Sequence, residues 1–495
     1  MSTLAYTPVS DIKDVVNQVR QGFNTRASLP LEYRKKQLQA IKRCLLDNAE
    51  QWKSGLQQDL GMDLLLQTTE VEFVVNEINF LLDNLSTWAA PEVRSVPLYT
   101  QPASGYIIKE PLGVVLVMGA WNYPISLVIK PLLGAIAAGN AAIIKPSEIS
   151  VNTARNFATL LPKYLDPALF AVVTGAVDQA TELLKHKFDH IVYTGNGKVA
   201  KIVATAAAQH LTPTTLELGG KSPVIVDDTI SLSTAASRIV WGKYANAGQT
   251  CVAPDYVFVK REVLPEFLHQ LSQHIRKYYG EDPKVSPDYS RIVNLNHVNR
   301  ILDLLEGQNI YHGGNYNQAD RYISPTIIIE PEENSKILTE EIFGPLLPVL
   351  PYDHLDDVIR YVSNRPKPLA LYIFSNSKSN QKKIIEGTSS GGVSINEVVS
   401  HVSCSNLPFG GVGDSGMGSY NGKASFDTFS HHRSVLKRSW LPDPAIRFPP
   451  FSQGKVSTVK ALASLRIPKM KTLAIPVLIG ILLTYRKPIT RILGF

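Results

Sequence analysis

One cysteine in the middle of the chain stands where a nucleophile could be exposed. The segment Asn246–Asp255 reads Asn-Ala-Gly-Gln-Thr-Cys-Val-Ala-Pro-Asp, so Cys251 follows a turn of small residues. A sulfur there can sit at a helix terminus with little steric cover, which lowers the pKa of a thiol and favours nucleophilic attack. Free cysteine is also among the most buried residue types, so a buried, inert Cys251 is the competing interpretation.

A carboxylate upstream of this cysteine could supply a base. The segment Thr215–Pro223 reads Thr-Leu-Glu-Leu-Gly-Gly-Lys-Ser-Pro and puts Glu217 just before a Gly-Gly turn. A glutamate at a flexible turn can reach a water molecule and act as a general base. The alternative is a surface carboxylate that pairs with Lys221.

A glycine motif indicates a nucleotide. The segment Ile191–Ala200 fits the pattern G-x-G-x-x-A from Gly195 onward and runs from an expected strand into an expected helix. Glycines before a helix N-terminus let the backbone approach phosphate. Glu217 lies roughly twenty residues further on, where this fingerprint expects an acid for a ribose hydroxyl. Spacing alone therefore leaves Glu217 with two roles, base or ribose ligand.

The elements that must position these residues alternate along the chain. Apolar residues recur at helical spacing from about Ile12 to Trp88, which predicts a helical N-terminal segment. From Gly113 onward, short β-branched runs alternate with helical stretches, which predicts an α/β fold with a mostly parallel, Rossmann-like sheet and a second α/β lobe after about Glu217. The expected strands are Val114–Met118, Ala141–Ile144, Ala171–Val173, His190–Tyr193, Val224–Val226, Val257–Val259, Thr326–Ile329, Leu371–Phe374 and Gly392–Ile395. The cleft between two such lobes is the expected place for chemistry.

Composition bounds the class of protein. With 495 residues, 44% of them hydrophobic and 19% charged, the chain is expected to be globular with two or three lobes. Its three cysteines, Cys44, Cys251 and Cys404, form no C-x-x-C pair, and histidines do not cluster, so neither a disulfide framework nor a metal site is expected. Residues 1–14 contain acids and no apolar run, so no secretory signal is expected.

The C-terminal tail differs from the rest of the chain. From Arg433 onward there are twelve Lys or Arg and one acid, Asp443, whereas the preceding part has 38 basic and 42 acidic residues. A basic tail points to an anionic partner. The apolar run Leu473–Tyr485 has thirteen residues and spans about 20 Å as a helix, short of the roughly 30 Å hydrocarbon core.

Lysines and arginines flank this run on both sides, which favours insertion into an anionic membrane surface, or a re-entrant hairpin, over a full crossing. A buried core helix is the alternative. The tail has no recognisable nucleic-acid reader module, so no nucleic-acid partner is expected.

Seven segments occur together and in the order found in the aldehyde dehydrogenase superfamily. They are Trp121–Pro124, Ile144–Glu148, Tyr193–Gly195, Leu216–Lys221, Gly248–Cys251, Glu341–Pro345 and Leu407–Gly411. The match runs from about Val15 to His432. Within it, Cys251–Tyr256, Phe409–Tyr420 and Ser425–His431 resemble the class 3 and fatty aldehyde dehydrogenase branch.

This resemblance implies roles for the catalytic residues. The Cys251 thiolate would attack the aldehyde carbonyl, and the Asn122 amide with the Cys251 backbone N–H would hold the oxyanion. Donors of this kind are worth about 3–4 kcal/mol each. After hydride transfer to NAD(P), Glu217 would deprotonate the water that hydrolyses the thioester. Trp121 and Tyr123 would line a substrate channel whose aromatic surface suits an apolar chain.

The resemblance also implies a coenzyme site. Lys145 and Glu148 would hold the adenosine ribose, Glu341 would hold the nicotinamide ribose with Phe343 packed beside it, and Gly195 would lie near the pyrophosphate or the ring. A carboxylate at Glu148 would repel a 2′-phosphate and Lys145 would attract one, so the sequence favours NAD and leaves NADP open.

The branch further implies a homodimer with a small oligomerisation arm, an apolar C-terminal anchor and a medium- to long-chain aliphatic aldehyde as substrate. The predicted domains are 1–216 for the N-terminal helices and coenzyme domain, 217–430 for the catalytic domain, 431–446 for the oligomerisation segment and 447–495 for the basic tail with its membrane-associating segment 473–485. The expected location is intracellular, on the cytoplasmic side of a membrane.

Other interpretations stay open at this point. The substrate could be a semialdehyde or a betaine-type, aromatic or apocarotenoid-like aldehyde. A catalytically silent scaffold protein is a further alternative, although a silent copy has no chemical need to keep Asn122, Glu217, Cys251 and Glu341.

Overall fold

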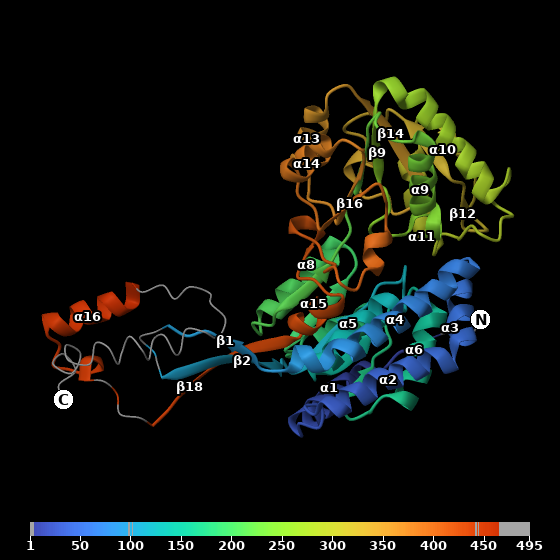
Figure 1. The fold of residues 1–495 in the computed structure, drawn as a ribbon. Helices are drawn as coiled ribbons and strands as arrows, with labels where there is room; N and C mark the ends of the chain where they lie inside the picture. The colour runs from blue at the N-terminus through green and yellow to red at the C-terminus, as the bar shows by residue number, and fades with distance from the viewer. Residues whose placement is uncertain (1–3, 98–99, 101, 441–442, 444, 465–495) are drawn as a thin grey trace. The chain divides into compact units, whose positions relative to one another are not determined.

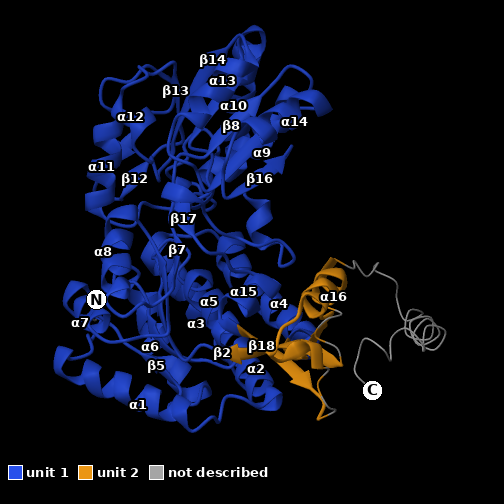
Figure 2. Ribbon diagram, turned by 90° about the vertical axis from the view of Figure 1, so that its left-hand side faces the viewer, with its two compact units in different colours: residues 1–88, 111–431 blue, residues 89–110, 432–495 orange. Residues whose placement is uncertain are grey.

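The computed structural model describes residues 4–97, 100, 102–440, 443 and 445–464, and it divides into two compact units (Figure 2). Unit 1 comprises residues 1–88 and 111–431, and unit 2 comprises residues 89–110 and 432–495. Both large sheets belong to unit 1. The predicted boundary at Glu217 falls inside this unit, where the chain leaves one sheet and enters the other.

The N-terminal segment of unit 1 is helical, as its spacing predicts. It contains α1 (Ile12–Asn24), α2 (Leu31–Asp47), α3 (Ala49–Leu60) and α4 (Leu64–Ala89). The apolar face of α2 is buried, since Leu38, Ile41 and Leu45 are at most 1% exposed. Helix α3 ends at Leu60 and is capped by Gly61, whose φ of +61° suits a residue without a Cβ.

A six-stranded sheet follows, in the order β17-β7-β6-β3-β4-β5. Its strands are β3 (Val114–Met118), β4 (Ala141–Lys145), β5 (Phe170–Val172), β6 (His190–Thr194), β7 (Thr214–Glu217) and β17 (Gly416–Met417). All pairs are parallel except β17 with β7. Strands β3 and β4 are buried at every position, as expected for a parallel sheet covered on both faces.

Four helices connect or flank these strands. They are α5 (Ser126–Ala138), α6 (Val151–Tyr164), α7 (Val177–Leu184) and α8 (Gly197–Ala208). The short helix α15 (Gly422–Thr428) packs on α5. Each strand of this βαβ series therefore ends where a loop can present polar side chains at the carboxyl edge of the sheet.

The second sheet of unit 1 has seven strands in the order β10-β13-β14-β9-β8-β15-β16. They are β8 (Pro223–Val226), β9 (Tyr256–Lys260), β10 (Ile310–His312), β13 (Thr326–Ile329), β14 (Leu346–Tyr352), β15 (Ala370–Phe374) and β16 (Gly392–Ile395). Only β10 is antiparallel to its neighbour among the pairs that the described residues form here. The expected strand Val224–Val226 thus belongs to this sheet, and β17 comes from within the predicted second lobe but joins the first.

Helices lie beside the strands of the second sheet (Figure 1). They are α9 (Leu232–Tyr244), α10 (Leu264–Tyr279), α11 (Leu295–Leu305), α12 (Lys336–Thr339), α13 (Leu355–Ser363) and α14 (Lys378–Gly387). A short hairpin, β11 (Tyr316–Asn317) with β12 (Tyr322–Ile323), completes this region. The α/β fold with two mostly parallel sheets agrees with the prediction from sequence.

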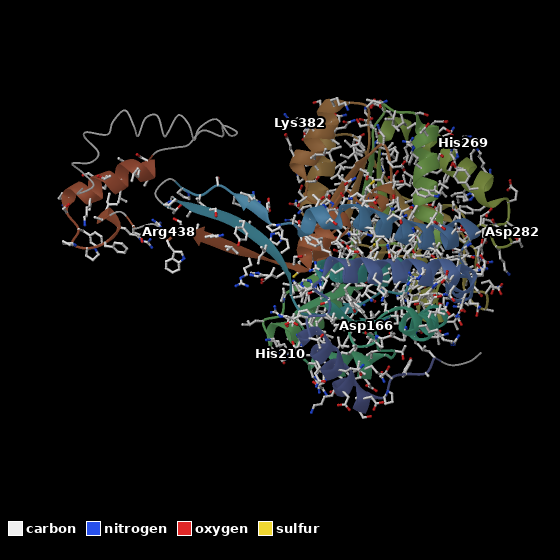
Figure 3. The ribbon with its side chains drawn as sticks, turned by 60° about the horizontal axis from the view of Figure 1, so that its bottom comes forward. Asp166, His210, His269, Asp282, Lys382 and Arg438 are labelled. Carbon is white, nitrogen blue, oxygen red and sulfur yellow. The ribbon has the colours of Figure 1, made fainter. Side chains whose placement is uncertain are left out.

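Unit 2 is small. Strands β1 (Glu92–Arg94), β2 (Ala103–Pro111) and β18 (Ser430–Arg438) form a three-stranded sheet, and α16 (Gln453–Ser464) follows. Arg438 at the end of β18, labelled in Figure 3, donates to the Thr100 carbonyl oxygen at 3.3 Å and lies 2.5 Å from the Asp443 carboxylate. The predicted segment Leu473–Tyr485 lies outside the described residues.

Candidate active site

Cys251 follows a strained turn. Helix α9 ends at Tyr244, and in the 3-10 turn Ala245–Gly248 both Asn246 (φ +50°) and Ala247 (φ +51°) are left-handed. Buried side chains hold this turn, because Asn246 Nδ2 donates to the Asn122 carbonyl oxygen at 2.9 Å and Gln249 Nε2 donates to the Asn246 carbonyl oxygen at 3.0 Å. Left-handed backbone at non-glycine residues persists only where the surroundings fix it. The turn therefore points to a functional constraint beside Cys251.

The electrostatic setting of Cys251 differs from the expectation. Burial, together with smaller contributions from the carboxylates of Glu341 and Glu217, raises the pKa of its thiol to about 12. The predicted lowering of this pKa at a helix terminus is wrong, because α9 ends seven residues before Cys251 and two acids lie near the sulfur. The thiol is partly exposed, and it borders a cavity.

Asn122 lies directly against this turn. It is 3% exposed in the loop between β3 and α5, and its Nδ2 donates to the Gln249 carbonyl oxygen at 3.0 Å. The side-chain amide nitrogen carries two N–H donors. One of them makes this bond and fixes the side chain, and the bond does not use the other. The next residue, Tyr123, shares a 2.8 Å hydrogen bond between its hydroxyl and that of Thr250. The Trp-Asn-Tyr-Pro motif is thereby fastened to the cysteine turn.

Glu217, at the end of β7, is a buried carboxylate. It is 2% exposed, and neither carboxylate oxygen has a hydrogen-bond partner within the described part of the chain. Burial raises its pKa well above the ordinary value. The surface ion pair with Lys221 is wrong, since Lys221 binds Asp255 instead. The burial and the charge interaction with Cys251 fit a base beside a nucleophile better than a ribose ligand.

Two motifs meet at Glu341. Its carboxylate accepts the Gly220 backbone N–H, and a Cβ on Gly219 would lie 2.1 Å from its Oε1, so a larger residue at 219 would displace this carboxylate. Burial raises the pKa of Glu341 to about 7, with a smaller contribution from Asp255 and opposed by Lys221. The Leu216–Lys221 and Glu341–Pro345 segments thus form one contact surface close to Cys251.

Three further predicted coenzyme residues, Lys145, Glu148 and Gly195, lie at the carboxyl edge of the first sheet. Lys145 ends β4 and pairs with Glu148 at 3.3 Å; burial lowers the Lys145 pKa, which Glu148 partly offsets. Gly195 follows β6, where a Cβ would lie 2.2 Å from the Tyr193 hydroxyl. The space around Gly197 at the start of α8 is open to 4 Å. A lysine, a carboxylate and an unobstructed helix N-terminus suit the ribose and phosphates of a dinucleotide.

Aromatic rings join two of the predicted residues. Trp121 packs edge-on against Phe343 with ring centroids 5.4 Å apart, and His297 of α11 lies 4.9 Å from the Trp121 ring. Trp121 does not border the cavity described below, whereas Tyr123 does. No sequence motif indicates His297, because only tertiary packing brings α11 to this ring pair.

A cavity of about 830 Å³ opens beside Cys251. Helix α4 forms one wall with Leu65, Leu66 and Phe73, which sequence reasoning missed, although apolar residues spread over more than one face of this helix could have signalled a second apolar surface. Other apolar lining residues are Leu127, Trp241, Val252, Val399, Val402 and Phe409. Pockets that bury a small molecule measure roughly 300–1,000 Å³, so the size suits an organic ligand.

Comparison with known proteins agrees with this geometry. The sequence model of the Aldehyde dehydrogenase family matches residues 1–435. Aldehyde dehydrogenase family 3 member A2 of Macaca fascicularis is 48% identical over 459 residues, which cover 92% of this chain and 95% of that protein. "Aldehyde dehydrogenase, dimeric NADP-preferring" of Mus musculus is 48% identical over 445 residues, 89% of this chain and 98% of that protein.

Solved structures agree as well. The substrate-bound state of Staphylococcus aureus AldH superposes with a TM-score of 0.89 at 41% identity and covers 91% of this chain and 99% of that one. The predicted superfamily, its class 3 branch and its fold are therefore confirmed. The chain belongs to the aldehyde dehydrogenase family and is an NAD(P)-dependent enzyme that oxidises aldehydes.

Proposed function

We propose that this enzyme acts on medium- to long-chain aliphatic aldehydes. The observation that carries the proposal is the cavity of about 830 Å³ that borders Cys251 and has a mostly apolar surface. Each methylene buried from water contributes about 0.8 kcal/mol. A cavity of this size favours a long apolar chain. Charged residues also border it, among them Lys130, Arg238 and Lys277.

Three residues carry the chemistry of the proposal. The Cys251 thiol gives its proton to solvent and its sulfur then bonds to the aldehyde carbon. The Asn122 amide and the Cys251 backbone N–H stabilise the oxyanion that forms. The bound nicotinamide coenzyme supplies the hydride acceptor. Glu217 takes a proton from the water that attacks the thioester, which releases the carboxylic acid and returns the thiol. Its buried, unpartnered carboxylate is suited to this because desolvation strengthens a base.

For the coenzyme, we propose that Lys145 and Glu148 hold the adenosine ribose, that the α8 N-terminus after Gly195 lies near the pyrophosphate, and that Glu341 holds the nicotinamide ribose beside Phe343. Glu148 disfavours a 2′-phosphate, which favours NAD. The name of the mouse relative, NADP-preferring, and the Lys145 cation support use of NADP as well.

We further propose that the basic tail attaches the enzyme to the cytoplasmic side of an anionic membrane. Exposed Phe448, Phe451 and Val456 in unit 2 stand among the cations Arg447 and Lys455, a combination suited to a lipid headgroup layer. Within the described residues, no helix has the length and apolarity to cross a membrane.

A homodimer is the proposed assembly. The mouse relative is named dimeric, and strand β16 at one edge of the seven-stranded sheet exposes Val393 and Ile395 at 39% and 40%. An apolar, unpaired edge strand is normally covered or charged. Sedimentation of the purified chain tests this, and a monomer at micromolar concentration would contradict it.

The substrate proposal is tested with a series of straight-chain aldehydes. At about 0.8 kcal/mol per methylene, kcat/KM should rise up to about fourfold per added methylene until the cavity is full. Cys251→Ala should form no NADH or NADPH, and a chain that ends at Trp440 should keep its turnover but lose binding to anionic vesicles. A flat chain-length profile contradicts the fatty substrate, and turnover by Cys251→Ala contradicts the mechanism.

A further inference from the structure

One side chain of helix α11 holds the turn that carries Glu341. Arg300 Nη1 donates to the carbonyl oxygen of Glu341 at 3.2 Å. Its Nη2 donates to the carbonyl oxygens of Ile342 at 2.7 Å and Phe343 at 3.3 Å. One guanidinium therefore binds three consecutive carbonyl groups, in the forked arrangement that only arginine provides.

The turn needs such a support because it is strained. Phe343 has a φ of +43°, in the left-handed region that an L residue with a bulky side chain rarely adopts. A residue in this region costs about 1–3 kcal/mol and persists only where its surroundings hold it. Asp255 fixes the other side of the turn by accepting the Ile342 N–H at 3.0 Å.

Lys221 supports the backbone that immediately precedes the Glu341 turn. Its Nζ binds the Asp255 carboxylate and donates to the carbonyl oxygens of Ile337 at 2.8 Å and Glu340 at 2.9 Å. Two cations thus hold the backbone from residue 337 to residue 343. Lys221 belongs to a motif that the sequence marks, whereas Arg300 belongs to none.

Tight contacts on its far side leave the Glu341 turn little freedom. A Cβ on Gly219 would lie 2.1 Å from Glu341 Oε1, and a Cβ on Gly248 would lie 2.2 Å from the Gly344 carbonyl oxygen. Gly248 belongs to the turn before Cys251, so segment 341–344 meets the glycine pair through the Glu341 side chain and the cysteine turn through the Gly344 backbone. A small displacement of the turn therefore moves the Glu341 carboxylate relative to both.

We propose that Arg300 is a positioning residue for Glu341: it holds the strained turn so that this carboxylate meets the ribose of the nicotinamide coenzyme. The proposal rests on the ribose role of Glu341 given above. Arg300 acts from behind the turn through backbone carbonyls and does not itself need to touch the coenzyme.

The test measures coenzyme binding rather than turnover. NADH and NADPH are titrated into the full-length protein and their fluorescence gives the dissociation constant. Arg300→Met keeps an unbranched side chain and removes all the donors, so the dissociation constant should rise about tenfold or more. Arg300→Lys keeps the charge and part of the hydrogen bonding, so the rise should stay within about threefold.

Arg34 offers a matched control in the same unit. It is 6% exposed and also donates to three carbonyl oxygens, those of Ser28 and Leu29 before α2 and of Ala137 in α5. Arg34→Met should lower the melting temperature while the dissociation constant stays within about twofold of the parent. An equal loss of coenzyme binding in Arg34→Met would overturn the proposal, because the effect would then reflect general destabilisation.

A double-mutant cycle separates this proposal from the role of Glu341. If Arg300 acts through Glu341, Arg300→Met has little further effect in a Glu341→Gln background, whereas additive effects overturn the proposal. Weaker binding in Glu341→Gln with unchanged binding in Arg300→Met overturns the Arg300 proposal alone. Unchanged binding in Glu341→Gln overturns the ribose role and the Arg300 proposal together.

Discussion

The raised pKa of the Cys251 thiol has a direct kinetic consequence in the coenzyme-free enzyme. An acid whose pKa is raised to about 12 by burial and two neighbouring carboxylates is protonated at neutral pH. At pH 7.5 the thiolate fraction is then about 3 in 100,000, against about one in ten for a thiol with an ordinary pKa of about 8.5. Only the thiolate reacts with an alkylating agent, so alkylation of Cys251 should be roughly 3,000-fold slower than that of an ordinary thiol.

The assay follows iodoacetamide modification by peptide mass between pH 6.5 and 10. The rate at Cys251 should rise about tenfold per pH unit over the whole range, because this range lies below the pKa. Exposed Cys404 serves as the internal control for reagent activity in the same sample. Cys44, which is buried, should stay unmodified in the folded protein. A plateau in the Cys251 rate below pH 9 would refute the reasoning, since it would mean that the carboxylates and burial do not hold the proton.

Glu341→Gln removes the neighbouring charge that acts most on this thiol, so the pH at which Cys251 alkylates at a given rate should move down; an unchanged profile would contradict the charge interaction. Glu217→Gln should stop turnover after one acyl transfer and give a burst of about one NADH per subunit, and steady turnover would exclude Glu217 as the base. Because burial raises the pKa of folded Glu217 above the value of about 4.3 that it has in the unfolded chain, folding stability falls as pH rises from that value through the folded pKa. Glu217→Gln should therefore raise the melting temperature at pH 8 and leave it unchanged at pH 4, and a lower melting temperature at pH 8 would show that the carboxylate is not desolvated. Gly219→Ala should weaken NADH binding about tenfold or more, because its Cβ would displace the Glu341 carboxylate, and binding equal to the parent would contradict that contact.

Much of the fold was accessible from local pattern. The predicted strands Val114–Met118, Thr326–Ile329 and Gly392–Ile395 have the bounds of β3, β13 and β16. Short β-branched runs bounded by turn residues signal strands wherever both faces are covered, so no long-range knowledge is needed. The local sequence does not determine which sheet a strand joins. Strand β8 joins the second sheet, and the two-residue strand β17, far along the chain, joins the first.

The sequence by itself determined the kind of chemistry, because Asn122, Glu217, Cys251 and Glu341 stand in motifs whose order is specific. Only the tertiary structure determined the pKa values of these groups. It also showed that α4 forms a wall of the cavity and that Arg300 binds the backbone of the Glu341 turn. Desolvation and charge interactions depend on what the folded chain packs around a group, and residues 34 to 124 positions apart along the chain supply those neighbours here. Residue types and spacing name the reacting groups, and packing in three dimensions sets how they react.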